Sequence, residues 1–192
     1  MDEELERVIA AHLAAGELTD AATVALSQLG PQIVGYLAAT LRDDEAAYEV
    51  FGHFSEQLWK SIATFRGDSS FKTWAYKLVM HSVGRYRRDG YRRLGVPLGS
   101  DILAIAEGVR SRTPPYQRTE IKDRVARLRE ALDTEEQTLL FLRIDQGLSW
   151  NDVAAIMSAE GEEVAIGTLR KRFERAKAQL RELAVKDGLL EE

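Results

Sequence analysis

Apolar residues recur three or four positions apart along most of the chain, which is the spacing of amphipathic helices. The first such stretch places Leu5, Ile9 and Leu13 on one face, and Gly16 is a typical residue at a helix end. No stretch alternates apolar and polar residues for long enough to form a sheet. The pattern therefore predicts an all-α fold.

Turn-forming residues predict where the next helices begin and end. A second helix is expected to start at Thr19 or Asp20, whose side chains can accept hydrogen bonds from the first turn. We expect it to end at Gly30-Pro31, because an interior proline lacks the N–H that a helix requires. A third helix is then expected over residues 32–41.

A longer amphipathic helix follows. Asp43 and Asp44 can cap it, and it is expected to reach about Ser61. A polar loop comes next at residues 65–70, and either of its two serines can cap a helix over residues 71–88. The apolar stripe of the longer helix consists of Tyr48, Phe51, Phe54, Leu58 and Ile62.

Residues 94–120 interrupt this periodicity and hold three of the four prolines. They are expected to be a linker with one short helix. Helical spacing resumes at residue 121 and predicts one helix to Leu132 and another that Gly147 ends. The sequence thus predicts two small helical domains, 1–93 and 121–192, joined by the linker. The apolar residues that define these two helices are Ile121, Val125, Leu128 and Leu132 in the first and Leu139, Leu140, Leu142 and Ile144 in the second.

The second domain ends in a pattern typical of a helix-turn-helix. Ser149 can cap a short helix, with Asp152 three residues on in the manner of a capping box. A second helix is expected over residues 166–183, with apolar residues on one face and basic residues on the other. In such a motif the second helix enters the major groove of DNA. A basic amphipathic helix that is simply solvated is the alternative.

Charge is strongly segregated, although the total is only −5. Residues 1–59 carry a net charge of −9 and residues 60–93 carry +7. Residues 133–167 carry −7, and six basic residues against Glu174 follow in residues 168–181. A polyanion responds to local fields within a Debye length of roughly 8 Å, so the two basic segments favour nucleic-acid binding. Solvated helix surface is the alternative explanation.

Aromatic and basic residues are interleaved between residues 65 and 93. Single-stranded nucleic acid is bound by this combination, because rings stack on bases and cations follow phosphates. At least half of these rings are expected to be buried core residues instead. The aromatic residues are Phe65, Phe71, Trp74, Tyr76, Tyr86 and Tyr91.

Several classes of protein lack support in the sequence. There is no cysteine, no apolar run that could span a bilayer, and an acidic rather than basic N-terminus, so a cytoplasmic location is expected. No phosphate-binding glycine loop or nucleophile motif is present, so we expect no enzyme activity, no cofactor and no metal. Glu49, His53 and Glu56 share a helical face and could ligate a metal, but an exposed surface cluster is the simpler interpretation.

Three segments together resemble a known family. FRGDSSFKTWAYK at residues 65–77 is similar to region two of the extracytoplasmic-function (ECF) sigma factors of bacterial RNA polymerase. LSWNDVA at 148–154 and GTLRKRFERA at 167–176 resemble region four of the same family. The order and spacing of the segments also fit. Two departures are His81, where the family commonly has asparagine, and an acidic corner at residues 158–166 that is longer than usual.

The resemblance implies a promoter-specificity subunit that binds core RNA polymerase and promoter DNA without membrane insertion, with an anti-sigma protein as a further candidate partner. It implies three sets of site residues. Those for recognition and melting of the downstream element are Phe65, Arg66, Asp68, Ser69, Phe71, Lys72, Trp74, Lys77, His81, Arg85 and Arg88. Those for the upstream element are Ser149, Thr168, Arg170, Lys171, Arg172 and Arg175. Those for core polymerase are Asp44, Tyr48, Glu49, Phe51, Glu56 and Trp59.

Two other functions stay open at this stage. A conventional helix-turn-helix regulator would bind duplex operators without polymerase, usually as a dimer on paired half-sites. An interaction adaptor would bind polymerase and show no promoter preference. Of the three hypotheses, only the sigma-factor hypothesis requires the aromatic and basic segment at residues 65–93 to open DNA.

Overall fold

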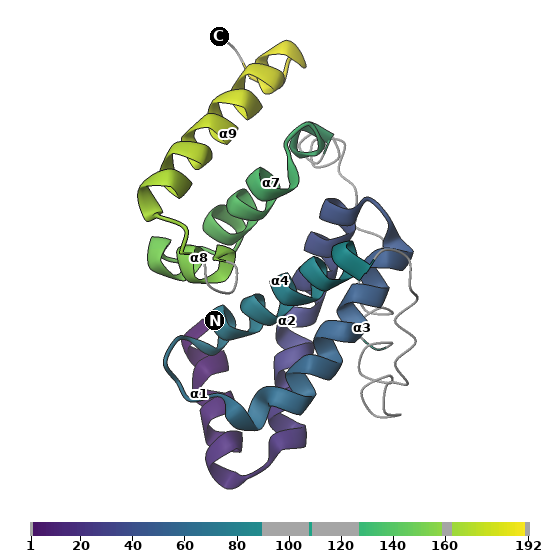
Figure 1. Cartoon of the computed structure of the whole chain (residues 1–192), viewed down its shortest axis with the longest axis vertical. Helices are drawn as coiled ribbons and strands as arrows, with labels where there is room; N and C mark the ends of the chain where they lie inside the picture. Colours follow the sequence, from purple (N-terminus) through teal and green to yellow (C-terminus); the bar gives the residue numbers. More distant parts are fainter. Residues whose placement is uncertain (1, 90–107, 109–126, 159–162, 191–192) are drawn as a thin grey trace. The chain divides into compact units, whose positions relative to one another are not determined.

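The computed structural model describes residues 2–89, 108, 127–158 and 163–190, and in these residues it contains helices and no strand. The all-α prediction is confirmed. The chain divides into two compact units, residues 1–114 and 115–192, which are described separately (Figure 1). The helices of the first unit are α1 (Asp2–Ala15), α2 (Leu18–Leu41), α3 (Asp44–Ser61), the 3-10 turn η1 (Ile62–Thr64) and α4 (Phe71–Asp89). Those of the second unit are α7 (Thr134–Leu140), the π-helical turn η2 (Phe141–Asp145), α8 (Trp150–Met157) and α9 (Ile166–Lys186).

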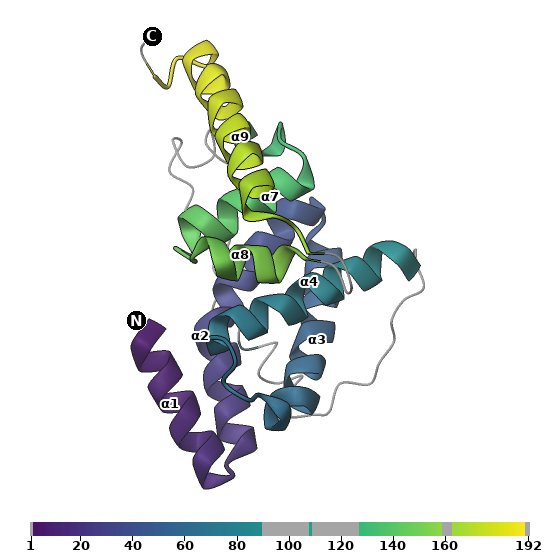
Figure 2. The same cartoon turned by 60° about the vertical axis from the view of Figure 1, so that its left-hand side comes forward.

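The first unit is built around α2, which packs against α1 on one side and α3 on another, while α4 packs against α3 and touches α1 (Figure 2). The packing buries the predicted stripe of α3 except for Tyr48, which is half-buried. Burial of large apolar side chains is the main force that holds such a unit together. The largest fully buried side chains here are Ile9, Leu26, Ile33, Leu37, Phe51, Phe54, Leu58, Ile62, Phe71 and Tyr76.

The predicted break at Gly30-Pro31 is wrong, because α2 runs through both residues. Proline costs about 3 kcal/mol inside a free helix, since it removes one hydrogen bond and crowds the preceding turn. Here Leu29 and Ile33 are buried on either side of Pro31, and their packing keeps the helix continuous. The expected cap is wrong too: α2 begins after Glu17 without a side-chain cap.

The cap of α3 agrees with prediction. The Asp43 carboxylate accepts hydrogen bonds from the backbone N–H groups of Glu45 and Ala46, at 2.9 and 3.1 Å. Arg42, in the left-handed conformation at φ 55°, separates the end of α2 from this cap. Helices α2 and α3 therefore meet at a corner with a defined geometry.

In the second unit, Asp133 and Glu136 form a reciprocal capping box at the start of α7. Gly147, at φ 65°, lies just beyond η2, where a helix end is predicted. Leu139, Leu140 and Leu142 are buried, but Ile144, the last of the four apolar residues in this segment, is 52% exposed. Ile144 lies within the wider i→i+5 turn, where successive residues are spaced differently around the axis than in an α-helix, and its side chain is outside the buried face.

The predicted linker at 94–120 and the start of the helix after it, at 121–126, lie outside the described residues, apart from Gly108. None of the helices in the described part of the chain combines the length and apolar character that crossing a bilayer requires.

Candidate nucleic-acid interfaces

The loop at residues 65–70 is fastened to the first turn of α4 by three aromatic rings. The ring centroids of Phe65 and Phe71 lie 5.2 Å apart, and those of Trp74 lie 5.4 Å from Phe65 and 5.2 Å from Phe71. Phe71 is fully buried, whereas Phe65 and Trp74 are half-buried. Arg66 and Asp68 are exposed on this loop, Ser69 is half-buried, and Gly67 has a φ of 77° that a side chain would strain. The loop therefore exposes polar groups while the ring cluster holds it against α4.

The backbone N–H groups at the head of α4 all have acceptors. Ser70 is the cap, as predicted, and its hydroxyl oxygen accepts from Thr73 N at 3.0 Å. The Glu6 carboxylate, from α1, accepts from Phe71 N at 2.9 Å and from Lys72 N at 3.3 Å. The Glu6 contact was not predicted, because nothing in the local sequence links residues 65 positions apart.

The outer face of α4 is basic. Lys77, His81, Arg85 and Arg88 are spaced four, four and three residues apart, so they lie on one side of the helix. His81, Arg85 and Arg88 are exposed, and Lys77 is half-buried. Two residues expected to contact DNA do not reach this surface. Phe71 is 0% exposed and Lys72 only 7%, because both belong to the first turn that packs inward.

The residues expected to bind core polymerase are also divided by burial. Asp44 is exposed, and Tyr48, Glu49 and Trp59 are half-buried. Phe51 is 1% exposed and Glu56 is 8% exposed, so neither is accessible to a partner as expected. Phe51 is a core residue. The Glu56 carboxylate accepts a short hydrogen bond from the Lys60 ammonium one turn further along α3.

His53 is buried rather than part of an exposed cluster. It is 7% exposed, and its Nε2 atom has no hydrogen-bond partner within the described protein. Burial lowers the pKa of His53, and the nearby Arg85 guanidinium lowers it further. The imidazole is thus held neutral at the edge of a small cavity whose other walls are Glu56, Gln57, Lys60 and Arg85. Glu49, His53 and Glu56 do not converge as metal ligands in the described structure.

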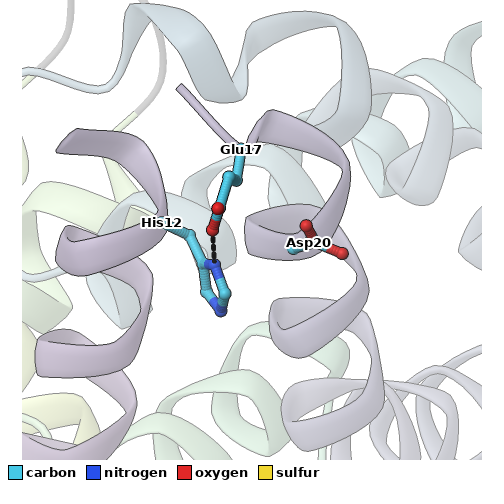
Figure 3. A group of neighbouring side chains, drawn as sticks. All are labelled: His12, Glu17 and Asp20. Carbon is cyan, nitrogen blue, oxygen red and sulfur yellow. Dashed lines mark hydrogen bonds and ion pairs between the residues drawn. The ribbon is translucent and has the colours of Figure 1, made fainter. Parts of the chain in front are cut away.

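Ligand-type atoms do converge at the corner between α1 and α2, where those of His12, Glu17 and Asp20 lie within 4.8 Å of one another (Figure 3). His12 Nδ1 and Glu17 Oε2 are 2.7 Å apart and form a hydrogen bond. That pairing accounts for the arrangement without an ion, since exposed carboxylates commonly gather in this way.

The short helix α8 and the longer α9 form the predicted helix-turn-helix. The Ser149 hydroxyl caps α8 by accepting from Asp152 N at 3.2 Å, and it also donates to the Asp152 carboxylate. Trp150 and Phe173 pack edge to face with centroids 5.4 Å apart, which joins the two helices. Arg143 and Arg170 place their guanidinium groups 5.2 and 5.6 Å from the centre of the Trp150 ring. Leu169 and Ala176 are fully buried beneath this contact.

The basic face of α9 is open to solvent but not uniform. Thr168, Arg170, Lys171 and Arg175 are exposed. Arg172 is half-buried and forms an ion pair with Glu135 of α7. Two of the expected DNA contacts, Ser149 and Arg172, therefore already have protein partners.

Most of the long acidic corner between α8 and α9 falls on residues 159–162, outside the described part of the chain. Its two ends are tied together: Val164 N donates to the Ser158 hydroxyl at 3.1 Å, and that hydroxyl donates to Ala154 O at 2.7 Å. The start of α9 at Ala165 has no side-chain cap.

Known proteins share this sequence and architecture. Residues 26–93 match the Sigma-70 region 2 family. The RNA polymerase sigma-H factor of Pseudomonas aeruginosa is 29% identical over 161 residues, which cover 76% of this chain and 77% of that protein. The ECF RNA polymerase sigma-E factor of Escherichia coli is 31% identical over 129 residues, or 62% of this chain and 63% of that protein.

Two solved structures are similar in fold. CnrH in complex with the cytosolic domain of CnrY has a TM-score of 0.61 at 20% identity, covering 95% of this chain and 99% of that one. The sigma factor RpoE in complex with the anti-sigma factor NepR from Bartonella quintana has a TM-score of 0.59 at 18% identity, covering 82% and 92%. At these identities the structural similarity establishes the fold alone.

Proposed function

Because this chain belongs to the ECF sigma factors of bacterial RNA polymerase, we propose that its two units divide promoter recognition between them. A sigma factor is the promoter-specificity subunit that directs core polymerase to initiate at defined sequences. The observation that carries the division is the presence of an exposed basic helix face in each unit, on α4 and on α9. The domain limits we propose are residues 1–93 and 121–192.

The first unit recognises and opens the downstream promoter element. Arg66, Asp68 and Ser69 lie on a loop that the aromatic contacts hold in place, and the half-buried rings of Phe65 and Trp74 are close by. Extruding a base costs a few kcal/mol, and stacking on an aromatic ring returns about 1–3 kcal/mol per base. Stacking therefore offsets a large part of the cost of each base that is captured. Lys77, His81, Arg85 and Arg88 then follow the displaced strand along α4.

The second unit anchors the upstream element as duplex DNA. Helix α9 presents Thr168, Arg170, Lys171 and Arg175 at or near its N-terminal half, which is the part of a recognition helix that reaches base edges. Arginine pairs with guanine through two hydrogen bonds, and lysine and threonine hold phosphates. The start of α9 has no side-chain cap, so its first backbone N–H groups can donate to a phosphate of the DNA.

Core polymerase binds along α3, through the accessible residues Asp44, Tyr48, Glu49 and Trp59. Both structural relatives were solved with a second protein, in one case an anti-sigma factor, so an anti-sigma protein is also proposed as a partner. The place of action is the cytoplasm, where core polymerase and DNA are found. The chain itself is a regulatory subunit rather than an enzyme, and it requires no cofactor or metal.

Transcription reconstituted with purified bacterial core polymerase tests the proposal. The chain and core enzyme are incubated with a library of genomic fragments, and the 5′ ends of the transcripts are sequenced. We expect defined start sites that share one upstream and one downstream element, and none without the chain. Absence of defined starts, together with tight binding of the free chain to duplex operators, would contradict the proposal and favour a conventional helix-turn-helix regulator.

A further inference from the structure

We propose that Glu6 is a positioning residue for promoter opening, although it lies in α1, outside every set of residues assigned above to DNA or polymerase. Its carboxylate holds the head of α4, and through it the loop at residues 65–70, in the conformation that receives DNA. This inference rests on the proposed role of that loop in opening the downstream element.

A count of backbone donors shows what Glu6 supplies. A helix begins with N–H groups that have no partner inside the helix. In α4 the first regular i→i−4 bond is that of Trp74 N to Ser70 O, at 3.0 Å, and the N–H just before it, of Thr73, donates to the Ser70 hydroxyl at 3.0 Å. The first two, of Phe71 and Lys72, donate to the two oxygens of Glu6. The serine cap is local, so Glu6 provides the link from the head of α4 to another helix.

The loop is held at both ends, and Glu6 secures one of them. At its start, Phe65 packs on Phe71 and Trp74. At its end, Ser70 leads into the turn whose N–H groups bind Glu6. The carboxylate is itself held in place because its neighbours in α1, Leu5 and Ile9, are 8% and 0% exposed. Movement of the α4 head would therefore displace Arg66 and Asp68.

A carboxylate suits this position for two reasons. Each of its two oxygens accepts from one of the two consecutive N–H groups, so the two donors do not share an acceptor. Its negative charge also offsets the partial positive charge at the N-terminus of a helix. Without it, the two N–H groups would be open to another anion, and the phosphates of bound DNA are the anions nearest at hand. The free N–H groups at the head of α4 would then compete with the loop at residues 65–70 for the phosphates of the DNA strand.

Three variants test the role: Glu6→Gln, Glu6→Ala and, as matched control, Glu3→Gln, whose side chain is exposed on the same helix. Hydrogen exchange of the Phe71 and Lys72 amides reports on the cap directly. We expect it to accelerate by roughly tenfold in Glu6→Gln and more in Glu6→Ala, the loss expected for one charge-assisted hydrogen bond and then for both. Glu3→Gln should leave both amides unchanged.

The functional readouts use the complete chain with core polymerase on a promoter found by transcript sequencing. We expect Glu6→Gln to open duplex promoter roughly tenfold more slowly. Its affinity for core polymerase should stay within about twofold of that of the parent chain. On a premelted promoter, transcription should likewise return to within about twofold of the parent level. A role in positioning predicts this combination, because only the opening step depends on the loop.

Two results would overturn the inference. One is unchanged promoter opening in Glu6→Gln and Glu6→Ala. The other is a parallel loss of core binding and of transcription from premelted promoter, which would mean that Glu6 supports folding generally. If the parent chain with core polymerase starts at no defined site, the proposed function itself fails, and the positioning role fails with it.

Discussion

Arg172 of α9 forms an ion pair with Glu135 of α7, while Arg170, two residues earlier, projects into solvent with its guanidinium 5.6 Å from the ring of Trp150. The two arginines belong to the same basic face, yet they differ in availability. The Arg172 side chain is 38% exposed and has a carboxylate partner, so DNA would have to replace that partner. Arg170 has no such competitor among the ion pairs of the described residues.

Replacement of Arg170 by alanine should therefore weaken binding of the upstream element more than replacement of Arg172. If Arg170 reads a base, its loss costs about 1–3 kcal/mol and relaxes the preference at one position. The measurement is the affinity of the reconstituted holoenzyme for a set of promoters that differ at single upstream positions. Equal weakening on every sequence would assign Arg170 to a phosphate instead.

Glu135→Gln is the companion variant for Arg172. It removes the charge that holds the guanidinium and leaves a side chain of the same size. We expect holoenzyme affinity for duplex DNA to rise slightly and to become more sensitive to salt, because one further cation can then displace counterions. Unchanged affinity and salt dependence would mean that the pair does not compete with DNA.

The aromatic residues that hold the loop at residues 65–70 in place should separate into core residues and residues that contact DNA. Phe71 is fully buried, so Phe71→Ala should lower the free energy of unfolding by about 3–5 kcal/mol. Phe65 is half-buried at the edge of the cluster, so Phe65→Ala should cost less stability, about 1–2 kcal/mol, and should slow promoter opening disproportionately. Chemical denaturation and permanganate reactivity of unpaired thymines measure the two effects. The expectation for Phe65 is wrong if opening falls only in proportion to the folded fraction.

Local signals in the sequence account for the parts of this structure that were predicted correctly. The caps at Asp43, Ser70 and Ser149 each depend on a side chain and a backbone N–H two or three residues away. Such contacts are visible in a short window of sequence, because the capping geometry admits few residue types. The helix-turn-helix was predictable for the same reason.

Contacts between distant segments account for what could not be predicted. Glu6 meets Phe71 across 65 residues, and Glu135 meets Arg172 across 37. A helical period alone does not say that His53 and Glu56 face the interior beside α4 rather than the solvent. Nor does it reveal the π-helical turn that contains the exposed Ile144. In each case the tertiary environment decides, and a local pattern carries no information about it.

Burial of His53 should make the first unit less stable in acid. Its pKa lies below 6.5 in the folded protein, chiefly because burial disfavours the charged imidazolium. Between this lowered pKa and the ordinary value near 6.5, the unfolded chain binds a proton that the folded chain does not, so stability should fall as the pH decreases from about 7 through that range. His53→Gln removes this titration and should flatten the decline, as measured by urea denaturation at several pH values. Identical pH dependence in the two proteins would contradict the assignment.

The unbroken course of α2 through Pro31 gives the last prediction. Pro31 has no N–H for the helix, but the buried residues on both sides, Leu29 and Ile33, hold the helix in place. Pro31→Ala should restore the missing hydrogen bond and relieve crowding against the preceding turn, and part of this gain is offset because the unfolded chain becomes more flexible. We expect a net increase of about 1–2 kcal/mol in the free energy of unfolding. Gln32→Ala, at the exposed next position, is the control and should change stability by less than about 0.5 kcal/mol. A loss of stability in Pro31→Ala would mean that a bend at the proline is needed for α2 to pack against both α1 and α3.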